Sequence, residues 1–205
     1  VSGVDKLDAH LARMSRSAAT LDIPFDPDAW RALVTEALRA WTAPGEAAMK
    51  LLMTRGAPAT GPMGMVTIDV LPADYTRQRR DGLKVITLNR GTASDAYAEA
   101  PWLLGGVKTL SYAVNMAAQR EAVRRGADDV IFVSSDGLVL ESPVSSVVWS
   151  VGRDLYTTSP GATGILAGTT QHLLFDHATA AGWRVSVGAA TVADLHAADV
   201  LWLIG

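Results

Sequence analysis

The sequence has 205 residues, of which 49% are hydrophobic, with a formal net charge of -3 and no cysteine. A chain of this size and composition can bury a core, so we expect one generous domain or two modest ones and no extensive disorder. The balanced charge, the lack of thiols and the absence of an HExxH spacing among the four histidines argue against nucleic-acid binding, disulfides and a catalytic metal site.

Residues 1–89 predict a small α+β domain. Apolar residues recur at helical spacing in two segments, the second of which has Asp26 as an N-cap and Pro27 at the first helical position. Apolar runs separated by a Gly/Pro-rich turn then indicate strands, which we expect to form a small sheet beside the helices. The predicted elements are helices over 7–21 and 26–41 and strands over 47–56, 63–72 and 83–89.

Residues 90–101 have no clear period and many small residues, so we predict an interdomain linker there. The second domain, residues 102–205, contains a predicted helix that ends at Gly126. A hairpin is expected around the SSDG turn at 134–137. The remaining predicted elements are a strand after the hairpin, a possible hairpin edge over 152–160, a helix ending at Gly182 and two short strands at the end.

Lys108 stands between a Gly-Gly-Val run and the start of the helix predicted from Ser111. Its apolar neighbours are compatible with a desolvated amine, which could form a Schiff base with a carbonyl compound. Composition alone favours the other interpretation, a lysine whose stem lies on the surface while its amine remains in water.

Glu141 ends an apolar strand and precedes a polar segment rich in hydroxyls. A carboxylate in this position could pair with a buried cation, such as a protonated ring nitrogen. The alternative is a glutamate at a sheet edge, exposed to water.

Thr169 and Thr170 follow Gly168 where a loop is predicted to enter a helix. Backbone N–H groups and hydroxyls could bind a phosphate there, although such residues commonly serve only as a helix cap. Arg13 on the first helix could reach a phosphate as well, or could be a surface arginine. A lysine, a strand-end glutamate and a phosphate-binding loop are three contacts that pyridoxal phosphate needs.

Three segments of the sequence resemble the fold-type IV pyridoxal-phosphate enzymes, which include branched-chain aminotransferases, D-amino-acid aminotransferases and aminodeoxychorismate lyases. They read HLARMSRSA, VKTLSYAVNMAAQREAVRRGADDVIFVSSDGLVLESPVSSVVW and GILAGTTQHLL, and the central one is the most specific. The resemblance covers most of the chain from residue 7 onward. It implies an α/β (α+β) fold of two domains, with a small N-terminal α/β domain and a larger, β-rich C-terminal domain that binds the cofactor.

The resemblance also implies roles for individual residues around the cofactor ring. Lys108 would form the Schiff base with pyridoxal 5'-phosphate and transfer protons. Glu141 would bind the pyridine nitrogen and keep it protonated. Tyr112 occupies the place where some members have a tyrosine near the phenolic oxygen of the cofactor.

The same resemblance implies a phosphate site. Arg13, Thr169 and Thr170 would bind the cofactor phosphate, and Ser145 and Ser146 match the small hydroxyl residues that follow the glutamate in the family. No metal ion is implied.

Two features depart from the family pattern. Glycine commonly follows the glutamate, whereas Ser142 and Pro143 do so here, and Val147 stands in the place of an asparagine. This affects the expected hydrogen bonding beside the glutamate. Family members also have a strand and turn before the first helix and a further turn and helix after the last strand, so we expect the chain to be part of a longer protein.

The KTLSY sequence at Lys108 resembles the KTLNY type of lyase-like members. We therefore expect a 4-amino-4-deoxychorismate lyase that yields 4-aminobenzoate and pyruvate for folate biosynthesis. The alternatives are an aminotransferase of D-amino or branched-chain amino acids, or a member that keeps the fold without catalysis. The resemblance implies a homodimer, and the absence of a signal peptide and of an apolar run of about 20 residues predicts a cytoplasmic protein.

Overall fold

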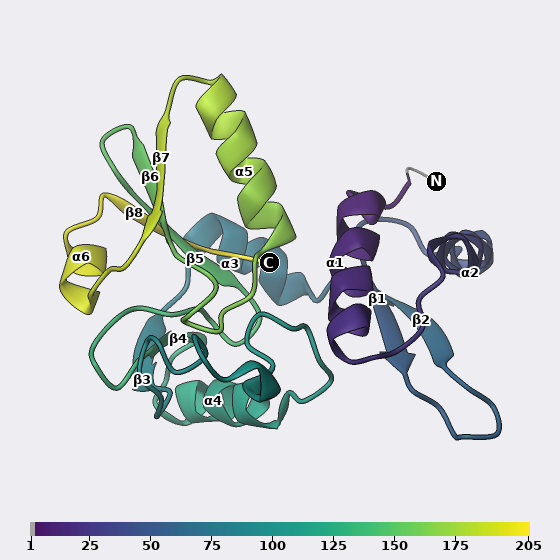
Figure 1. Cartoon of the computed structure of the whole chain (residues 1–205). Coiled ribbons are helices and arrows are strands. Elements are labelled where there is room, and N and C mark those ends of the chain that lie inside the picture. The colour runs from purple at the N-terminus through teal and green to yellow at the C-terminus, as the bar shows by residue number, and fades with distance from the viewer. Residues whose placement is uncertain (1–2) are drawn as a thin grey trace. The chain divides into compact units, whose positions relative to one another are not determined.

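A computed structural model describes residues 3–205 of the chain (Figure 1). The chain divides into two compact units, Val1–Gly82 and Leu83–Gly205. Within the described residues, the first unit has three helices and two strands, and the second combines six strands with three α-helices and one 3-10 helix. This mixture of helices and strands agrees with the α/β (α+β) fold predicted from the sequence.

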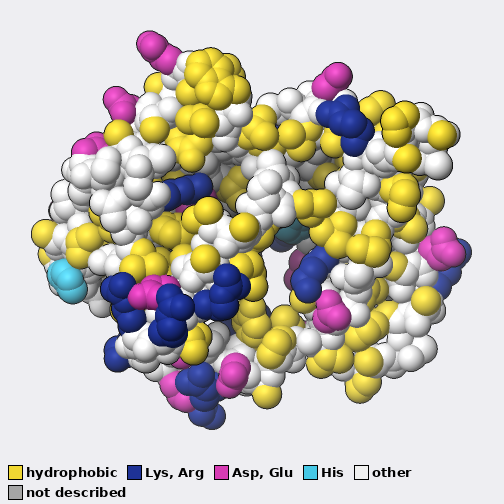
Figure 2. Space-filling model, turned by 90° about the horizontal axis from the view of Figure 1, so that it is seen from below, with side chains coloured by type: hydrophobic (Ala, Val, Ile, Leu, Met, Phe, Trp, Pro, Cys, Tyr) yellow, Lys and Arg dark blue, Asp and Glu magenta, His cyan; other side chains and the backbone are white. Residues whose placement is uncertain are grey.

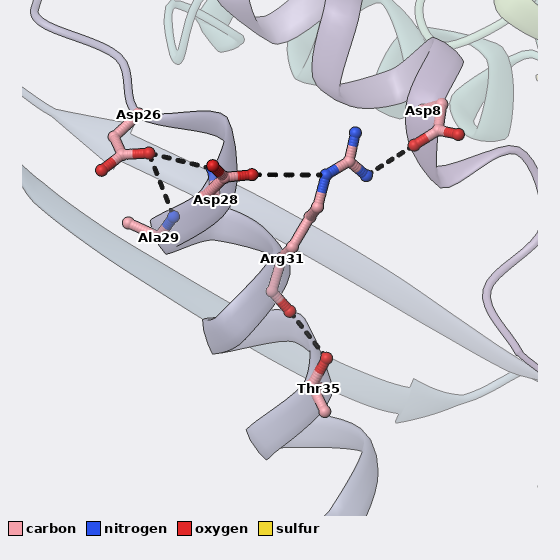
Figure 3. A network of polar contacts seen from close by, with 6 residues as sticks. All are labelled: Asp8, Asp26, Asp28, Ala29, Arg31 and Thr35. Atoms are coloured by element: carbon pink, nitrogen blue, oxygen red, sulfur yellow. Dashed lines mark hydrogen bonds and ion pairs between the residues drawn. The ribbon is translucent and has the colours of Figure 1, made fainter.

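The first unit opens with two helices, α1 (Leu7–Thr20) and α2 (Pro27–Ala40). The Asp26 carboxylate caps α2 by accepting hydrogen bonds from the N–H groups of Asp28 (2.9 Å) and Ala29 (3.2 Å), as predicted (Figure 3). Arg31 on α2 reaches α1, where its Nη1 donates to Asp8 Oδ1 at 2.6 Å. The two helices are thus linked by an ion pair at their N-terminal ends.

An antiparallel pair of strands, β1 (Ala47–Thr54) and β2 (Met63–Val70), packs with α2. The buried Trp30 lies so close to Gly64 on β2 that a Cβ added there would be 2.9 Å from the indole ring. Glycine therefore allows the helix to approach the strand. The unit ends with α3 (Ala73–Asp81), which has no buried residue.

In the second unit, β4 (Asp129–Val133) lies between two apolar clusters. It pairs in parallel with β3 (Val85–Asn89). Val130 and Phe132 point into a cluster with alanines of α4 (Ala113–Arg124), whereas Ile131 joins the residues of β5 (Ser146–Val151). This alternation follows the period of two in a strand, and it makes β4 the centre of the unit.

The other layer of the second unit is a four-stranded sheet in the order β7 (Arg184–Gly188), β6 (Asp154–Thr158), β5 and β8 (Val200–Ile204). Helix α5 (Thr169–Ala180) covers one face through Phe175 and Ala178, which pack on Val148 and Leu155. A short helix, α6 (Val192–His196), connects β7 to β8. Figure 1 shows α4 below β3 and β4, and α5 beside the sheet.

The strand predicted over residues 83–89 does not complete the sheet of the first domain, so that expectation is wrong. β3 pairs instead with β4, more than forty positions later, and this places the boundary of the compact units before residue 89. The predicted linker, residues 90–101, has no regular structure over most of its length, and a 3-10 helix (Pro101–Leu103) begins at its last residue. The SSDG hairpin is confirmed by the pairing of Val133 with Val139.

The surface carries charges of both signs. Figure 2 shows one face on which Lys and Arg side chains are interspersed with Asp and Glu side chains among hydrophobic ones. The chain contains exposed ion pairs, such as Arg125 with Glu121 and Arg80 with Asp81. Within residues 3–205, no helix has the length and apolar character required to cross a membrane.

Candidate active site

Lys108 lies in the loop between the 3-10 helix and α4. Its Nζ donates a hydrogen bond of 2.6 Å to the hydroxyl of Tyr112, four residues further on, and lies 5.3 Å from the centre of that ring. Lys108 is exposed, as composition alone favoured, and the other interpretation, an amine desolvated by its apolar neighbours, is wrong. The position of the amine is fixed by Tyr112 instead.

Glu141 is largely buried, with 12% of its side chain exposed. Its Oε1 lies 3.4 Å from Arg90 Nη1, and its Oε2 accepts a hydrogen bond of 3.0 Å from the N–H of Leu166. Burial raises the pKa of the Glu141 carboxyl, while the Leu166 N–H and the positive charges of Arg90 and Lys108 act in the opposite direction. The alternative of a glutamate exposed at a sheet edge is therefore wrong.

The residues after Glu141 form a closed turn despite the departure from the family pattern. The N–H of Ser142 donates to the carbonyl of Ser145 at 2.9 Å. The buried hydroxyl of Ser142 donates to Asp129 Oδ2 at 3.0 Å. Burial raises the pKa of Asp129, against the hydrogen bonds from Val130 N–H and Ser142. The serine thus gives the neighbouring strand carboxyl a partner that a glycine could not provide.

Helix α5 begins beside Ser146. Gly168 occupies its N-cap position, and no side chain caps the helix. A Cβ added at Gly168 would lie 2.4 Å from Ser146 Oγ, so the backbone of the helix start and this hydroxyl are in close contact. Thr169 and Thr170 are the first residues of the helix. Free N–H groups at a helix start next to hydroxyls suit a phosphate.

Of the two predicted hydroxyl residues, Ser145 directly precedes β5 and Ser146 is its first residue, opposite Ile204 of β8. Gly205 follows that strand, and a Cβ added there would be 3.1 Å from Ser145 Oγ. The Thr170 hydroxyl donates to the carbonyl of Gly205 at 3.2 Å. Residues 145–146, the start of α5 and the end of β8 therefore meet at one place.

The loop that carries Lys108 is tied to the loop that leads into α5. The N–H of Gly106 donates to the carbonyl of Gly164 at 3.0 Å. The ring of Tyr97 fills the space beside both loops, because a Cβ added at Gly105 or Gly164 would lie 2.6 or 2.4 Å from it. These contacts bring the lysine loop, the Leu166 N–H and Glu141 into one neighbourhood.

Arg90 and Tyr97 are residues of this neighbourhood that the sequence did not single out. Arg90 is one of several arginines that pattern alone could not rank, and both residues lie in the predicted linker. One sequence signal could have identified Arg90, because it directly follows an apolar strand. Side chains at the ends of neighbouring strands lie close together at the same edge of a sheet. The packing of Tyr97 against two glycines has no sequence signal that we can identify.

Arg13 lies on α1 in the first unit, where it is half-buried. It is not among the residues that the second unit brings together, namely Lys108, Tyr112, Glu141, Ser145, Ser146, Thr169 and Thr170. Its contact with a phosphate stays a prediction, as do the roles of those residues toward the cofactor.

The residues of the second unit fit pyridoxal phosphate. Lys108 carries a primary amine, the group that can bond covalently to the cofactor aldehyde, and the buried carboxyl of Glu141 can pair with a ring nitrogen that carries a proton. The uncapped start of α5 suits the phosphate group. The described residues contain no group of three or more His, Asp or Glu side chains that could hold a metal ion.

Comparison with known proteins gives consistent relatives. The family model "Amino-transferase class IV" matches residues 3–205. A bifunctional aminodeoxychorismate lyase / D-amino acid transaminase of Mycobacterium tuberculosis is 43% identical, over 97% of this chain and 72% of its own length.

Solved structures show the same fold. A hypothetical aminotransferase from Mycobacterium tuberculosis, bound to pyridoxal phosphate, has a TM-score of 0.93 at 42% identity, covering 98% of this chain and 72% of that one. A fold IV transaminase from Curtobacterium pusillum has a TM-score of 0.88 at 42% identity, covering 98% and 70%. With the family match and the cofactor-fitting residues of the second unit, these likenesses show that the chain belongs to amino-transferase class IV, as a fold-type IV enzyme that depends on pyridoxal phosphate.

Proposed function

We propose that this enzyme is a 4-amino-4-deoxychorismate lyase, which yields 4-aminobenzoate and pyruvate in folate biosynthesis. The observation that carries the proposal is the Lys108 amine, held by the Tyr112 hydroxyl at 2.6 Å, with its charge acting on the buried Glu141. The KTLSY sequence, which resembles that of lyase-like members, supports the lyase, as does the first half of the Mycobacterium tuberculosis relative's name.

Each candidate residue has a proposed contact with the cofactor. In the proposed site Lys108 binds it covalently and Glu141 pairs with the ring nitrogen. The uncapped N–H groups of α5, with Thr169 and Thr170, would bind the phosphate. The family resemblance supports Arg13 as a phosphate ligand. Tyr112 would contact the phenolic oxygen of the cofactor, and the hydroxyls of residues 145 and 146 would contact its phosphate end.

When bound, pyridoxal phosphate supplies an electron sink for the charge left on the substrate carbon after proton removal. The Lys108 amine accepts the proton from the ring carbon that bears the substrate amine, and Tyr112 holds Nζ in place while it does so. The bond between the substrate ring and the enolpyruvyl oxygen then breaks and the ring becomes aromatic. Lys108 can return its proton to the departing enolpyruvate, which becomes pyruvate.

Transamination of D-amino or branched-chain amino acids is the second candidate. In that reaction Lys108 would again move the proton, and pyridoxal phosphate would supply the acceptor for the amino group of the substrate, which would leave as a keto acid. The transaminase half of the name of the Mycobacterium tuberculosis relative and the Curtobacterium pusillum transaminase favour this activity. The two reactions differ in one requirement, because only transamination needs a keto-acid acceptor.

The test is an absorbance spectrum of the protein with pyridoxal phosphate, repeated on Lys108→Ala, followed by addition of 4-amino-4-deoxychorismate. We expect a borohydride-sensitive band that the variant lacks, and release of 4-aminobenzoate without a keto acid, falling by about 10²–10⁴-fold in the variant. Lys50→Ala, at an exposed ion pair with Asp69, is the matched control. A band without this product would support the aminotransferase, and no band would refute the proposed site.

We also infer that the enzyme works as a cytoplasmic homodimer. Large apolar side chains are exposed along the 3-10 helix and α4, which supports a partner surface there. They are Trp102, Leu103, Leu110, Val114, Met116 and Val123. Light scattering on the purified protein tests the oligomeric state, and a monomer at all concentrations would contradict the dimer.

A further inference from the structure

Arg90 comes directly after the last residue of β3. Its N–H donates to the carbonyl of Val133 at 2.8 Å, so it extends the pairing of β3 with β4 by one residue. Its guanidinium lies 5.6 Å from the ring centre of Phe132 and its Nη1 lies 3.4 Å from Glu141 Oε1. The side chain therefore crosses β4 to reach the glutamate.

Phe132 holds both partners of this ion pair in place. Its N–H donates to the carbonyl of Glu141, and its carbonyl accepts from the N–H of Leu140, both at 2.9 Å. The Arg90 guanidinium lies over its buried ring. Because one residue fixes the backbone of Glu141 and the side chain of Arg90, their relative position is set by the strand pairing.

The ion pair is shielded from water. The side chains of Arg90 and Glu141 are 21% and 12% exposed, whereas those of the surface pair Arg31 and Asp8 are 46% and 84% exposed. Solvent screens a surface pair almost completely, but it screens a partly buried pair much less. The charge of Arg90 therefore acts on Glu141 with little loss.

Three groups near Glu141 favour its ionised form. The Leu166 N–H donates to Oε2, and the positive charges of Lys108 and Arg90 attract the carboxylate. Lys108 changes its charge in the proposed proton transfer, whereas a guanidinium stays protonated at every accessible pH. Arg90 is the permanent cation of the three.

We infer that Arg90 is a positioning residue, which keeps the Glu141 side chain ionised and oriented to bind the protonated ring nitrogen of pyridoxal phosphate. The inference rests on the proposed role of Glu141. It assigns a function to a residue of the segment that joins β3 to the 3-10 helix. Arg90 itself does not touch the reacting atoms, since it acts through the carboxylate.

The test compares two ligands, pyridoxal phosphate and its analogue in which carbon replaces the ring nitrogen. Affinities are measured by quenching of the tryptophan fluorescence in the complete protein. We expect the wild type to prefer pyridoxal phosphate, and Arg90→Gln to reduce this preference by about tenfold, as for loss of a hydrogen bond to a charged group. Arg90→Lys, which keeps the charge, should restore most of it.

Two further variants separate the inference from the role of Glu141. In Glu141→Gln the preference for pyridoxal phosphate should vanish, and adding Arg90→Gln should change it no further. Arg153→Gln is the matched control, since Arg153 also lies over a ring, that of Trp183 at 5.3 Å, and it should behave as wild type. Thermal unfolding checks the fold, and Arg90→Met, which keeps an apolar stem over Phe132, is a second neutral variant.

The outcomes are distinct. If Glu141→Gln removes the ligand preference while both neutral Arg90 variants keep it, Arg90 has no part in the site and this inference is wrong, although the proposed function stands. If the wild type shows no preference, the role of Glu141 fails and the inference fails with it. A wild type that forms no borohydride-sensitive band would instead refute the proposed function.

Discussion

Strand β4 and residues 138–141 form a hairpin. Both the turn and the open end of this hairpin contact the segment that follows β3, but through carboxylates in different surroundings. At the turn, the exposed Asp136 accepts hydrogen bonds from Ser94, at 2.8 Å from its N–H and 2.6 Å from its hydroxyl. At the open end, the buried Glu141 pairs with Arg90. Burial raises the pKa of Glu141, whereas the hydrogen bonds from Ser94 and Ser134 lower that of Asp136 to about 2.

The two carboxylates therefore have different roles: Asp136 is a structural anchor, and Glu141 belongs to the candidate active site. Asp136 meets its partners in water and is ionised at any pH near neutral, so it can only hold the segment in place. Glu141 is a buried carboxyl whose ionisation depends on the charges around it, which is the property expected of a residue that binds a cationic ring. One hairpin thus fixes the scaffold at one end and presents the reactive neighbourhood at the other.

The comparison would break if the two carboxylates contributed equally to activity. We expect Glu141→Gln to lower the turnover of 4-amino-4-deoxychorismate by about 10²–10³-fold, because an amide cannot supply the charge opposite the ring nitrogen. Asp136→Asn is the matched control, and its turnover should remain within about twofold of wild type. Steady-state release of 4-aminobenzoate measures both.

A similar loss in the two variants would mean that activity follows the integrity of the hairpin and not the buried charge. Circular dichroism and thermal unfolding of both proteins distinguish a folding defect from a local one. If Glu141→Gln retained full turnover, the assignment of the ring-nitrogen contact to Glu141 would be wrong.

Two glycines, one in the candidate active site and one in the hairpin turn, provide a second test of this difference between site and anchor. Gly168, at the start of α5, has an ordinary φ of -67°, but a Cβ there would be 2.4 Å from Ser146 Oγ. Gly137, in the hairpin turn, has open space around it and a φ of +90°. We expect Gly168→Ala to weaken pyridoxal phosphate binding by about tenfold, the cost of one disturbed hydrogen bond to a charged group. Gly137→Ala should lower the free energy of unfolding by about 1–2 kcal/mol, without changing affinity.

Fluorescence titration with pyridoxal phosphate and urea unfolding measure these two quantities. Because the clash at Gly168 involves a hydroxyl, the double variant Gly168→Ala with Ser146→Ala should recover part of the affinity lost by the single one. Affinity that falls in Gly137→Ala as much as in Gly168→Ala would contradict the separation of anchor and site.

Local patterns predicted much of this fold. The Asp26 cap with Pro27, the apolar stripes of α1 and α2 and the SSDG turn each depend on neighbours in sequence, and all appear in the structure. Helix α3 was not predictable in this way, because its residues are all at least partly exposed and give no apolar stripe. The partner of β3 was missed because strand pairing is decided by packing over long distances in sequence.

In the candidate site, too, residues in local motifs could be predicted from the sequence, whereas a residue defined by a long-range contact could not. The local sequences around Lys108, Glu141 and Thr169 identified these residues, since the family resemblance rests on contiguous motifs. Composition favoured a surface position for Lys108, and the residue is exposed, because apolar neighbours in sequence need not be neighbours in space. Arg90 reaches a residue 51 positions away, and no periodicity in its own segment marks it.

The smallest effect that we expect is in the acid stability of the turn. The folded chain lowers the pKa of Asp136 from 3.8 to about 2, so the ionised carboxyl stabilises the fold fully above about pH 4, and this stabilisation is lost as the pH falls toward 2. Asp136→Asn should therefore lower the melting temperature near pH 5 by a few degrees at most, as is usual for an exposed group, and the difference from wild type should shrink as the pH falls to 2. Melting curves of both proteins from pH 2 to 5 measure it, and taking their difference removes the contribution of other carboxyls. A difference that stayed constant over this range would mean that the Ser94 hydrogen bonds stabilise the fold equally with a protonated carboxyl, so the turn would be held by geometry and not by charge.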